Sequence, residues 1–376
     1  MKIVIAPDSF KESLTALEVS QAIKTGLARV WPDAEYVSVP IADGGEGTVQ
    51  ALIDATGGKK VYTEVRDPRG NPIQACYGVL GDSTTAVIEV AEACGLHRIP
   101  LDQRDTKYTS SYGVGQLILN ALDLGVNRLI IGLGGTATTD GGSGMLAALG
   151  GKFLDIEGEQ ITPCGEALLK VHQIDVSKLD SRLSQCEILV ACDVDNPLCG
   201  DMGAAAFFGP QKGATSEDIA ILDKALLQFG KVTEKTSVRP VINAKGAGAA
   251  GGMGAAWLGY THAQLKPGVE LVLQIVELED QLLDADLVIT GEGKIDKQTI
   301  HGKAPVGVAK LAKKHDIPVI AVAGCTNDGY QSVYDSGIDA VFTCVPRAMN
   351  LDDAFAEAET NLTNLAENIA RMYQLY

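Results

Sequence analysis

Short apolar runs that end at polar or glycine-rich turns recur at both ends of this 376-residue chain. The runs are residues 2–6, 36–41, 287–290, 318–323 and 340–345. Helical patterns alternate with them, and the first begins at Thr15-Ala16-Leu17-Glu18, which has the spacing of a capping box. Repeated strand–helix units with short loops predict a parallel sheet that is covered by helices on both faces.

The middle of the chain has a different pattern. Residues 61–65, 72–79 and 84–90 predict short strands separated by turn signals, and glycine loops follow. We therefore expect an α/β protein with two domains. The first is a Rossmann- or flavodoxin-like domain with a parallel sheet, which is formed by both chain ends, residues 1–60 plus 285–376. The second is an α/β domain of α+β character, residues 61–284, which is inserted between them. The cleft between two such domains is the expected active site.

Composition excludes several functional classes. The chain carries 31 Lys+Arg against 48 Asp+Glu, a net charge of −17, so it lacks the basic surface that nucleic acid polymers and anionic membranes require. No apolar segment approaches the roughly 20 residues of a membrane span. The N-terminal apolar run is too short for a signal peptide, and the eight Cys contain no Cys-x-x-Cys pair. These features predict a cytoplasmic protein with reduced thiols.

Four glycine-rich clusters contain a large share of the 42 Gly. They are residues 42–48, 132–144, 246–254 and 290–299. Glycine allows backbone N–H groups to surround an oxyanion, and hydroxyl groups among the glycines add further donors. A single loop of this kind is more often a tight turn, but four such clusters, most of them next to a predicted strand, favour an anionic ligand such as a phosphate.

Carboxylates follow several of the predicted strands. They are Asp8, Asp43, Asp193, Glu292 and Asp296. Side chains at the carboxyl ends of parallel strands point into the crevice where such sheets bind ligands. Phosphoryl transfer needs Mg²⁺, cations on the transferring group and a carboxylate that accepts the hydroxyl proton. The cation candidates are Lys11, Lys212, Lys294 and Lys303.

Two Gly-x-Gly-x-x-Gly-like stretches, 246–251 and 132–137, suggest an alternative function. A dinucleotide fold needs a strand before the motif, a helix after it and a second strand that ends near an acidic residue about 20 positions on. After 246–251 the next strand ends only near Thr290, and after 132–137 more glycines follow. An NAD(P)-dependent hydroxy-acid oxidoreductase is nevertheless kept as the alternative enzyme, and a solute-binding protein without turnover as a third hypothesis.

The whole chain also resembles a known family, the type-1 bacterial glycerate kinases. The matching stretches are residues 6–11, 42–48, 134–144, 192–200, 208–214, 246–252, 265–268 and 290–303. The resemblance implies ATP- and Mg²⁺-dependent phosphorylation of glycerate by two unlike α/β domains. Thr136 and Thr139 stand where the family usually has Ser and Asn, so the hydroxyl is kept at the first position and an amide is lost at the second.

The hypothesis is therefore a glycerate kinase that moves the γ-phosphoryl group of ATP to a glycerate hydroxyl. Asp193 is the expected general base, Lys11 and Lys303 stabilise charge, and Asp43 and Asp296 bind the metal. The expected substrate- and phosphate-binding residues are Asp8, Ser9, Gly134, Gly135, Thr136, Thr138, Asn196, Gly248, Gly251, Gly291 and Glu292. The sequence leaves open the phosphorylated hydroxyl, the enantiomer, formation of a homodimer, and which loop holds ATP.

Overall fold

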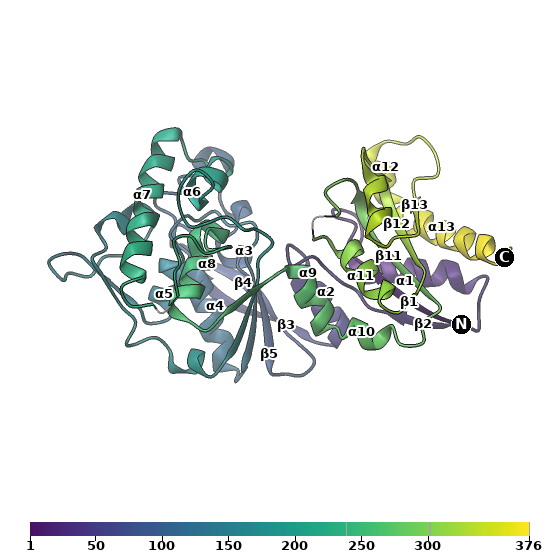
Figure 1. Cartoon of the computed structure of the whole chain (residues 1–376), viewed down its shortest axis with the longest axis horizontal. Helices are drawn as coiled ribbons and strands as arrows, with labels where there is room; N and C mark the ends of the chain where they lie inside the picture. The colour runs from purple at the N-terminus through teal and green to yellow at the C-terminus, as the bar shows by residue number, and fades with distance from the viewer. Residues whose placement is uncertain (238, 301, 376) are drawn as a thin grey trace. The chain divides into compact units, whose positions relative to one another are not determined.

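The computed structural model describes residues 1–237, 239–300 and 302–375. The chain forms two compact units (Figure 1). Unit 1 comprises Met1–Asp43, Gln50–Gly58 and Pro267–Tyr376, and unit 2 comprises Gly44–Val49 and Lys59–Lys266. The segment 267–284, which the sequence assigns to the inserted domain, lies in unit 1.

Unit 1 contains a five-stranded sheet in which every pair is parallel. Its strands are β1 (Lys2–Pro7), β2 (Glu35–Ser38), β11 (Leu287–Ile295), β12 (Val319–Thr326) and β13 (Ala340–Thr343). The spatial order is β13-β12-β11-β1-β2. Counted along the unit, this is the flavodoxin-like order 2-1-3-4-5. The prediction of a flavodoxin-like parallel sheet built from both chain ends is confirmed.

One strand of this sheet is longer than expected. The glycines at 291 and 293 predict a turn after a short strand, whereas β11 continues to Ile295 because Lys294 and Ile295 still pair with β12. Gly291 suits this position, since a Cβ there would lie 2.2 Å from the carbonyl oxygen of Val322. The glycine is therefore needed for close strand packing.

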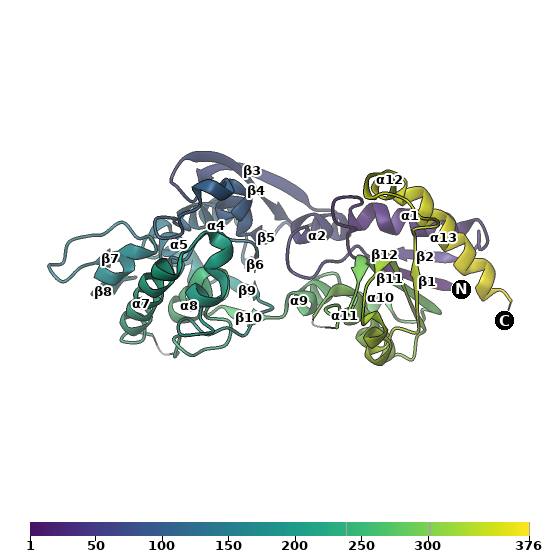
Figure 2. The ribbon, with the colours of Figure 1, turned by 90° about the horizontal axis from the view of Figure 1, so that it is seen from above.

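Helices cover both faces of the sheet of unit 1 (Figure 2). They are α1 (Ala16–Ala28), α2 (Thr48–Thr56, whose first residues belong to unit 2), α9 (Gly268–Ile275), α10 (Leu278–Gln281), α11 (Ala304–Lys313), α12 (Leu351–Ala356) and α13 (Ala358–Tyr373). The capping box at Thr15 is present, which confirms the predicted helix start. One apolar core joins α1 and α13 to alternate side chains of β1 and β11, such as Ile5 and Ile289. Helix α11 packs against the same strands from the other side.

Unit 2 has a mixed six-stranded sheet in the order β10-β9-β6-β5-β4-β3. The strands are β3 (Lys59–Arg66), β4 (Pro72–Val79), β5 (Thr85–Glu89), β6 (Arg128–Gly132), β9 (Glu187–Ala191) and β10 (Gln264–Lys266). The β3–β4 and β4–β5 pairs are antiparallel and the other pairs are parallel. A separate antiparallel pair is formed by β7 (Lys152–Leu154) and β8 (Gln173–Asp175).

The helices of unit 2 enclose one large apolar core that includes Phe229 and Trp257. They are α3 (Ala91–Cys94), α4 (Tyr112–Asp123), α5 (Ser143–Ala148), α6 (Ala204–Phe208), α7 (Ser216–Thr233) and α8 (Ala249–Tyr260). Short 3₁₀ helices connect several elements of the two units: Leu96–Arg98, Leu101–Gln103, Glu166–Lys170, Ser181–Ser184, Pro210–Lys212 and Tyr330–Ser336. Across the part of the chain that the structure describes, no helix has both the length and the apolar character needed to cross a membrane.

The contact of α1 with α13 depends on Gly26. A Cβ at this position would lie 2.1 Å from the carbonyl oxygen of Thr363 and 2.7 Å from Cβ of Ala366. We expect Gly26→Leu to lower the free energy of unfolding by about 1–3 kcal/mol, because overpacking forces the helices apart. Chemical denaturation measures this change. Gln21→Ala on the exposed side of α1 is the control, and unchanged stability of the Gly26 variant would contradict the packing argument.

Candidate active site

A cavity of about 390 Å³ lies in unit 1 at the carboxyl ends of its parallel strands. Its lining residues come from the segments that follow β1 and β13 and from the last parts of β11 and β12. Helices α1 and α11, which follow β1 and β11, cover opposite faces of the sheet. The cavity therefore adjoins the topological switch point between these two strands, where doubly wound sheets bind ligands.

Asp8 is the buried carboxylate at this switch point. It follows β1 directly, its side chain accepts a 2.6 Å hydrogen bond from the backbone N–H of Ser9, and the residue is only 7% exposed. Burial, together with the nearby negative charges of Asp43 and Glu292, raises the pKa of Asp8 to about 7. The hydrogen bond from Ser9 and the charge of Lys11 only partly oppose this rise. Asp43 and Glu292 thus lie close enough to Asp8 to repel its charge.

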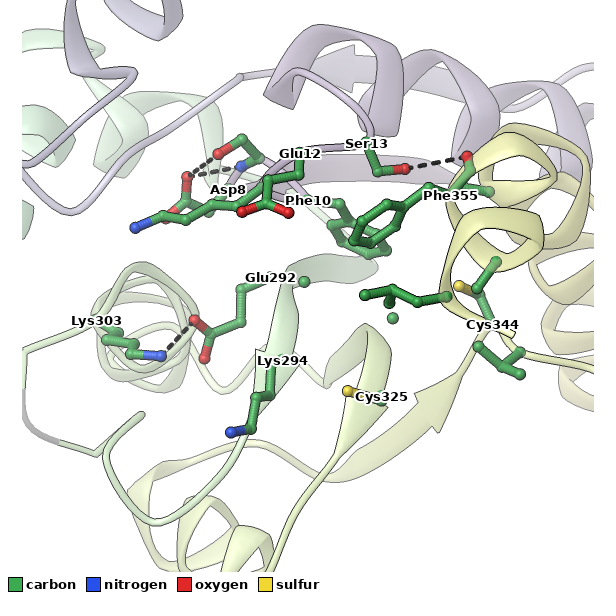
Figure 3. Close-up of a pocket in the computed structure, with 18 of the residues that line it drawn as sticks. Asp8, Phe10, Glu12, Ser13, Glu292, Lys294, Lys303, Cys325, Cys344 and Phe355 are labelled. Atoms are coloured by element: carbon green, nitrogen blue, oxygen red, sulfur yellow. Dashed lines mark hydrogen bonds and ion pairs between the residues drawn. The ribbon is translucent and has the colours of Figure 1, made fainter. Parts of the chain in front are cut away.

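Glu292 in β11 has two defined partners. Thr299 Oγ1 donates to its Oε1 at 2.6 Å. Lys303 Nζ forms an ion pair with its Oε2 at 2.9 Å (Figure 3). Burial raises the pKa of Glu292, while these two partners lower it and limit the rise. Lys303 is the N-cap residue of α11, so the ion pair connects the strand to the next helix across the rim of the cavity.

Seven residues predicted from the sequence line this cavity. They are Asp8, Ser9, Lys11, Asp43, Glu292, Lys294 and Lys303. Two others from the same unit, Gly291 and Asp296, do not contribute to its lining. Gly291 packs against β12, as described above. Asp296 accepts a hydrogen bond from Gln298 N at 2.8 Å and pairs with Lys294 at 3.4 Å, and these interactions lower its pKa.

In unit 2 the loop at 134–144 is organised by a buried lysine. Lys212 is 3% exposed, and its Nζ donates to the backbone oxygen of Thr138 at 2.6 Å and to Thr136 Oγ1 at 3.2 Å. Burial lowers the pKa of Lys212 to about 8, while the charges of Cys94 and Asp140 oppose this change. Thr136 and Thr138, predicted as phosphate ligands, are therefore buried in the loop and contact Lys212.

Asp140 supports the same loop from inside. Its carboxylate accepts hydrogen bonds from the backbone and side chain of Ser111, both at 2.8 Å, and from the N–H groups of Gly142 and Gly144, both at 3.1 Å. Burial raises the pKa of Asp140, and these four donors oppose the rise. The carboxylate thus fixes the glycine turn at the start of α5.

The exposed part of the loop lines a second pocket. Gly134 and Gly135 are exposed at a pocket of about 580 Å³ that also includes the carboxylates of Glu46, Glu89 and Glu92. Gly135 has φ +65, a left-handed conformation that favours glycine. Glu89 accepts a 2.9 Å hydrogen bond from the backbone of Val49, and burial with neighbouring carboxylates raises its pKa.

The remaining predicted residues of unit 2 lie elsewhere in the unit. Asp193 is exposed just beyond β9, and Asn196 donates from Nδ2 to the backbone oxygen of Met202 at 2.7 Å. Gly248 and Gly251 provide close packing. A Cβ at Gly248 would lie 2.3 Å from the oxygen of Pro197, and one at Gly251 would lie 2.0 Å from the oxygen of Thr138.

The stretch 246–251 does not have the surroundings of a dinucleotide-binding motif. Between Thr233, where α7 ends, and Gly246, the residues that the structure describes form no strand. The glycines then enter α8 with positive φ angles at Gly251 and Gly252, and Gly251 O accepts a 2.9 Å hydrogen bond from Gly141 N. The motif supports the loop at 134–144, and its geometry does not favour the oxidoreductase alternative.

Sequence reasoning left several residues of these sites without a role. Lys212 was a cation candidate with no assigned partner, and Asp140 was not selected, although a carboxylate before Gly-Gly-Ser-Gly signals a buried turn. The apolar lining of the unit 1 cavity, which includes Phe355, was also missed. Its residues carry no chemical signature, because apolar side chains after strands are indistinguishable from core residues in a sequence.

The fold and the cavity define a two-unit α/β protein with a charged ligand cavity at the switch point of a flavodoxin-like sheet. Residues 3–374 match the model of the Glycerate kinase family. Glycerate kinase of Bacillus subtilis (strain 168) is 52% identical over 375 residues, covering 100% of this chain and 98% of the relative. Glycerate 2-kinase of Escherichia coli (strain K12) is 51% identical over 370 residues, covering 98% and 97%.

A solved structure agrees with these sequence matches. The crystal structure of a protein provisionally named glycerate kinase 2 from Salmonella typhimurium LT2 superposes with a TM-score of 0.93 at 50% identity, covering 100% of this chain and 98% of the other. The chain belongs to the glycerate kinase family. The resemblance seen in its motifs is confirmed.

The low pKa of Lys212 predicts a pH-dependent stability. Between pH 8 and 10.5 the unfolded chain holds the Lys212 proton and the folded chain has lost it, so the contribution of Lys212 to the free energy of unfolding becomes more favourable as the pH rises. Relative to Lys212→Met, we expect the wild type to gain on the order of 3 kcal/mol across this range. Chemical denaturation of both proteins at several pH values measures this difference in the free energy of unfolding. Lys231→Met, on the exposed side of α7, is the matched control, and a pH-independent difference for Lys212→Met would contradict the prediction.

Proposed function

We propose that this chain is a glycerate kinase that transfers the γ-phosphoryl group of ATP to a hydroxyl group of glycerate. The main support is sequence identity. About half of the residues of this chain are identical to those of enzymes named glycerate kinase or glycerate 2-kinase, over nearly the full length of both chains. The charged cavity at the carboxyl ends of β1 and β11 supports it, since phosphoryl transfer depends on positioned charge. Among the residues that the structure describes, we find no feature that favours the oxidoreductase or the solute-binding hypothesis.

The unit 1 cavity has the donors that Mg²⁺ prefers. Among the described residues no preformed group of three or more His, Cys, Asp or Glu could hold a metal ion. Mg²⁺ in kinases is commonly bound by only one or two carboxylates together with phosphate oxygens and water. We propose Asp43 and Asp8 for this role, because each lines the cavity and the negative charge of Asp43 adds to burial in raising the pKa of Asp8. Bound Mg²⁺ would neutralise charge on the phosphates.

The expected metal ligand Asp296 fits this role less well. It is paired with Lys294 and does not line the cavity, so we propose that Asp296 stabilises the turn at 296–299. Lys11 and Lys303 remain the proposed charge-stabilising residues, since both line the cavity beside the carboxylates. The ion pair between Lys303 and Glu292 orients the ammonium group before a phosphate binds.

For glycerate we propose the turn at Gly134 and Gly135 in unit 2. Exposed glycine N–H groups can bind a carboxylate without a side-chain cation, and Glu89 and Glu92 of the same pocket can accept hydrogen bonds from hydroxyl groups. Lys212 and Asp140 stabilise the conformation of the loop through buried hydrogen bonds to its backbone. They act as positioning residues in this proposal.

The assay that tests the activity also identifies the product. Purified protein with ATP, Mg²⁺ and either enantiomer of glycerate should release ADP, and one enantiomer should react preferentially. From the name of the Escherichia coli relative we expect the 2-phosphate. Proton-coupled phosphorus NMR then gives a doublet, since one proton lies on the carbon that bears the phosphate, whereas the 3-phosphate gives a triplet. No ADP release above background with either enantiomer would remove the proposal.

Asp193 stays the proposed general base, and its neighbour provides a matched control. We expect Asp193→Asn to lower kcat by about 10²–10⁴-fold, because an amide cannot accept the hydroxyl proton. Asp195→Asn changes an equally exposed carboxylate of the same loop, which pairs with Lys245 at 3.0 Å, and should keep kcat within twofold. Steady-state kinetics on both variants decides the role, and near-normal kcat for Asp193→Asn would exclude it as the base.

A further inference from the structure

The unit 1 cavity has two chemically different ends (Figure 3). The charged end carries Asp8, Glu292 and Lys303. The other end, beyond the carboxyl ends of β12 and β13, is lined by apolar side chains. These are Phe10, Cys344, Val345, Leu351, Ala354 and Phe355. Transfer of a small phosphoryl group onto a small acid gives no reason for an apolar wall of this size.

Two of these apolar side chains are exposed in a way that favours a ligand. Val345 is 37% exposed and Leu351 is 65% exposed, although both belong to the cavity lining. Covering such surface with an apolar group releases free energy in proportion to the area removed from water. Phe355 is half-buried and adds aromatic surface to the same end, and aromatic rings favour contact with a planar heterocycle. Phe10 is only 3% exposed and belongs to the core behind this wall.

The apolar wall is also held in position. Ser13 Oγ donates to the backbone oxygen of Phe355 at 3.4 Å, which connects α12 to the segment after β1. Asn350 caps α12 by accepting a 2.8 Å hydrogen bond from Asp353 N. The wall is therefore a formed surface, and a ligand that covers it does not have to order it first.

Only one of the two substrates matches both ends. Each carbon of glycerate carries oxygen, so glycerate has no apolar face to bury. A purine nucleoside triphosphate has a flat heterocycle at one end and phosphates at the other, joined by a ribose. A volume of about 390 Å³ lies within the range of small-molecule and cofactor pockets.

We infer that the unit 1 cavity is the nucleotide site, with the base of ATP against Val345, Leu351 and Phe355 and its phosphates at Asp8, Asp43, Lys11 and Lys303. This inference rests on the proposed kinase function for the identity of the nucleotide. The sequence left open which loop holds ATP. The inference assigns ATP to the cavity of unit 1 and glycerate to the loop at Gly134 and Gly135 in unit 2.

The test separates base binding from phosphate binding. ADP and inorganic tripolyphosphate are each titrated by calorimetry, with Mg²⁺, into the wild type, Leu351→Ala and Asp352→Ala. Leu351→Ala removes apolar surface from the wall and should weaken ADP about tenfold while tripolyphosphate binds as in the wild type. Asp352→Ala changes the next exposed residue of α12, which does not line the cavity, and should bind both as the wild type does.

A second variant blocks the cavity instead of enlarging it. Ala354→Trp fills the apolar end, so ADP binding should fall by more than tenfold, and the KM for ATP should rise while the KM for glycerate stays the same. Circular dichroism and thermal melting confirm that each variant folds. ADP affinity within twofold of the wild type in both folded variants would overturn the inference, as would equal weakening of ADP and tripolyphosphate.

The experiments distinguish failure of the nucleotide site from failure of the proposed function. If the wild type phosphorylates glycerate but neither wall variant affects ADP, the nucleotide site is wrong and the kinase activity stands. If no glycerate is phosphorylated but ADP binds in a manner that depends on Leu351, the nucleotide site stands and the acceptor is wrong.

Discussion

The parallel pairing of β1 with β11 is the constraint on which the rest of unit 1 depends. It aligns Ile3 with Leu287 and Pro7 with Gly291, and the N–H of Asp8 continues the pairing with a 2.8 Å hydrogen bond to Gly291 O. The two strands are far apart in the sequence, so this pair joins the N-terminal and C-terminal segments of unit 1 in one sheet. It also brings Asp8 and Glu292 to the same cavity, and their mutual repulsion contributes to the raised pKa of Asp8.

The fold of unit 1 was predictable because parallel strands that are buried on both faces read as continuous apolar runs. All five runs at the chain ends correspond to strands or to their immediate extensions, and the capping box located the start of α1. The end of β11 was not predictable. Gly291 and Gly293 look like a turn in the sequence, and only pairing with β12, a long-range contact, shows that the strand continues. Local patterns report local preference, and tertiary pairing overrides them.

The charged end of the cavity was predictable for a different reason. Asp8, Asp43 and Glu292 follow or end strands, and topology alone sends such residues to one edge of a parallel sheet. The glycine clusters were harder to interpret, because glycine serves ligand contact and close packing equally well. Gly135 is exposed in a pocket, whereas Gly251 packs closely against the backbone of Thr138. No single sequence distinguishes these two uses, since the difference lies in what a Cβ would meet.

The net charge of −17 and the carboxylates of the cavity belong to the same physical argument. Burying Asp8 beside Asp43 and Glu292 costs free energy in the empty enzyme, and the raised pKa of Asp8 measures that cost. A ligand that brings a divalent cation removes it, so part of the binding free energy comes from relief of repulsion. The charge at one end of the unit 1 cavity and the apolar surface at the other therefore both support the proposed assignment of the metal-bound nucleotide to this cavity.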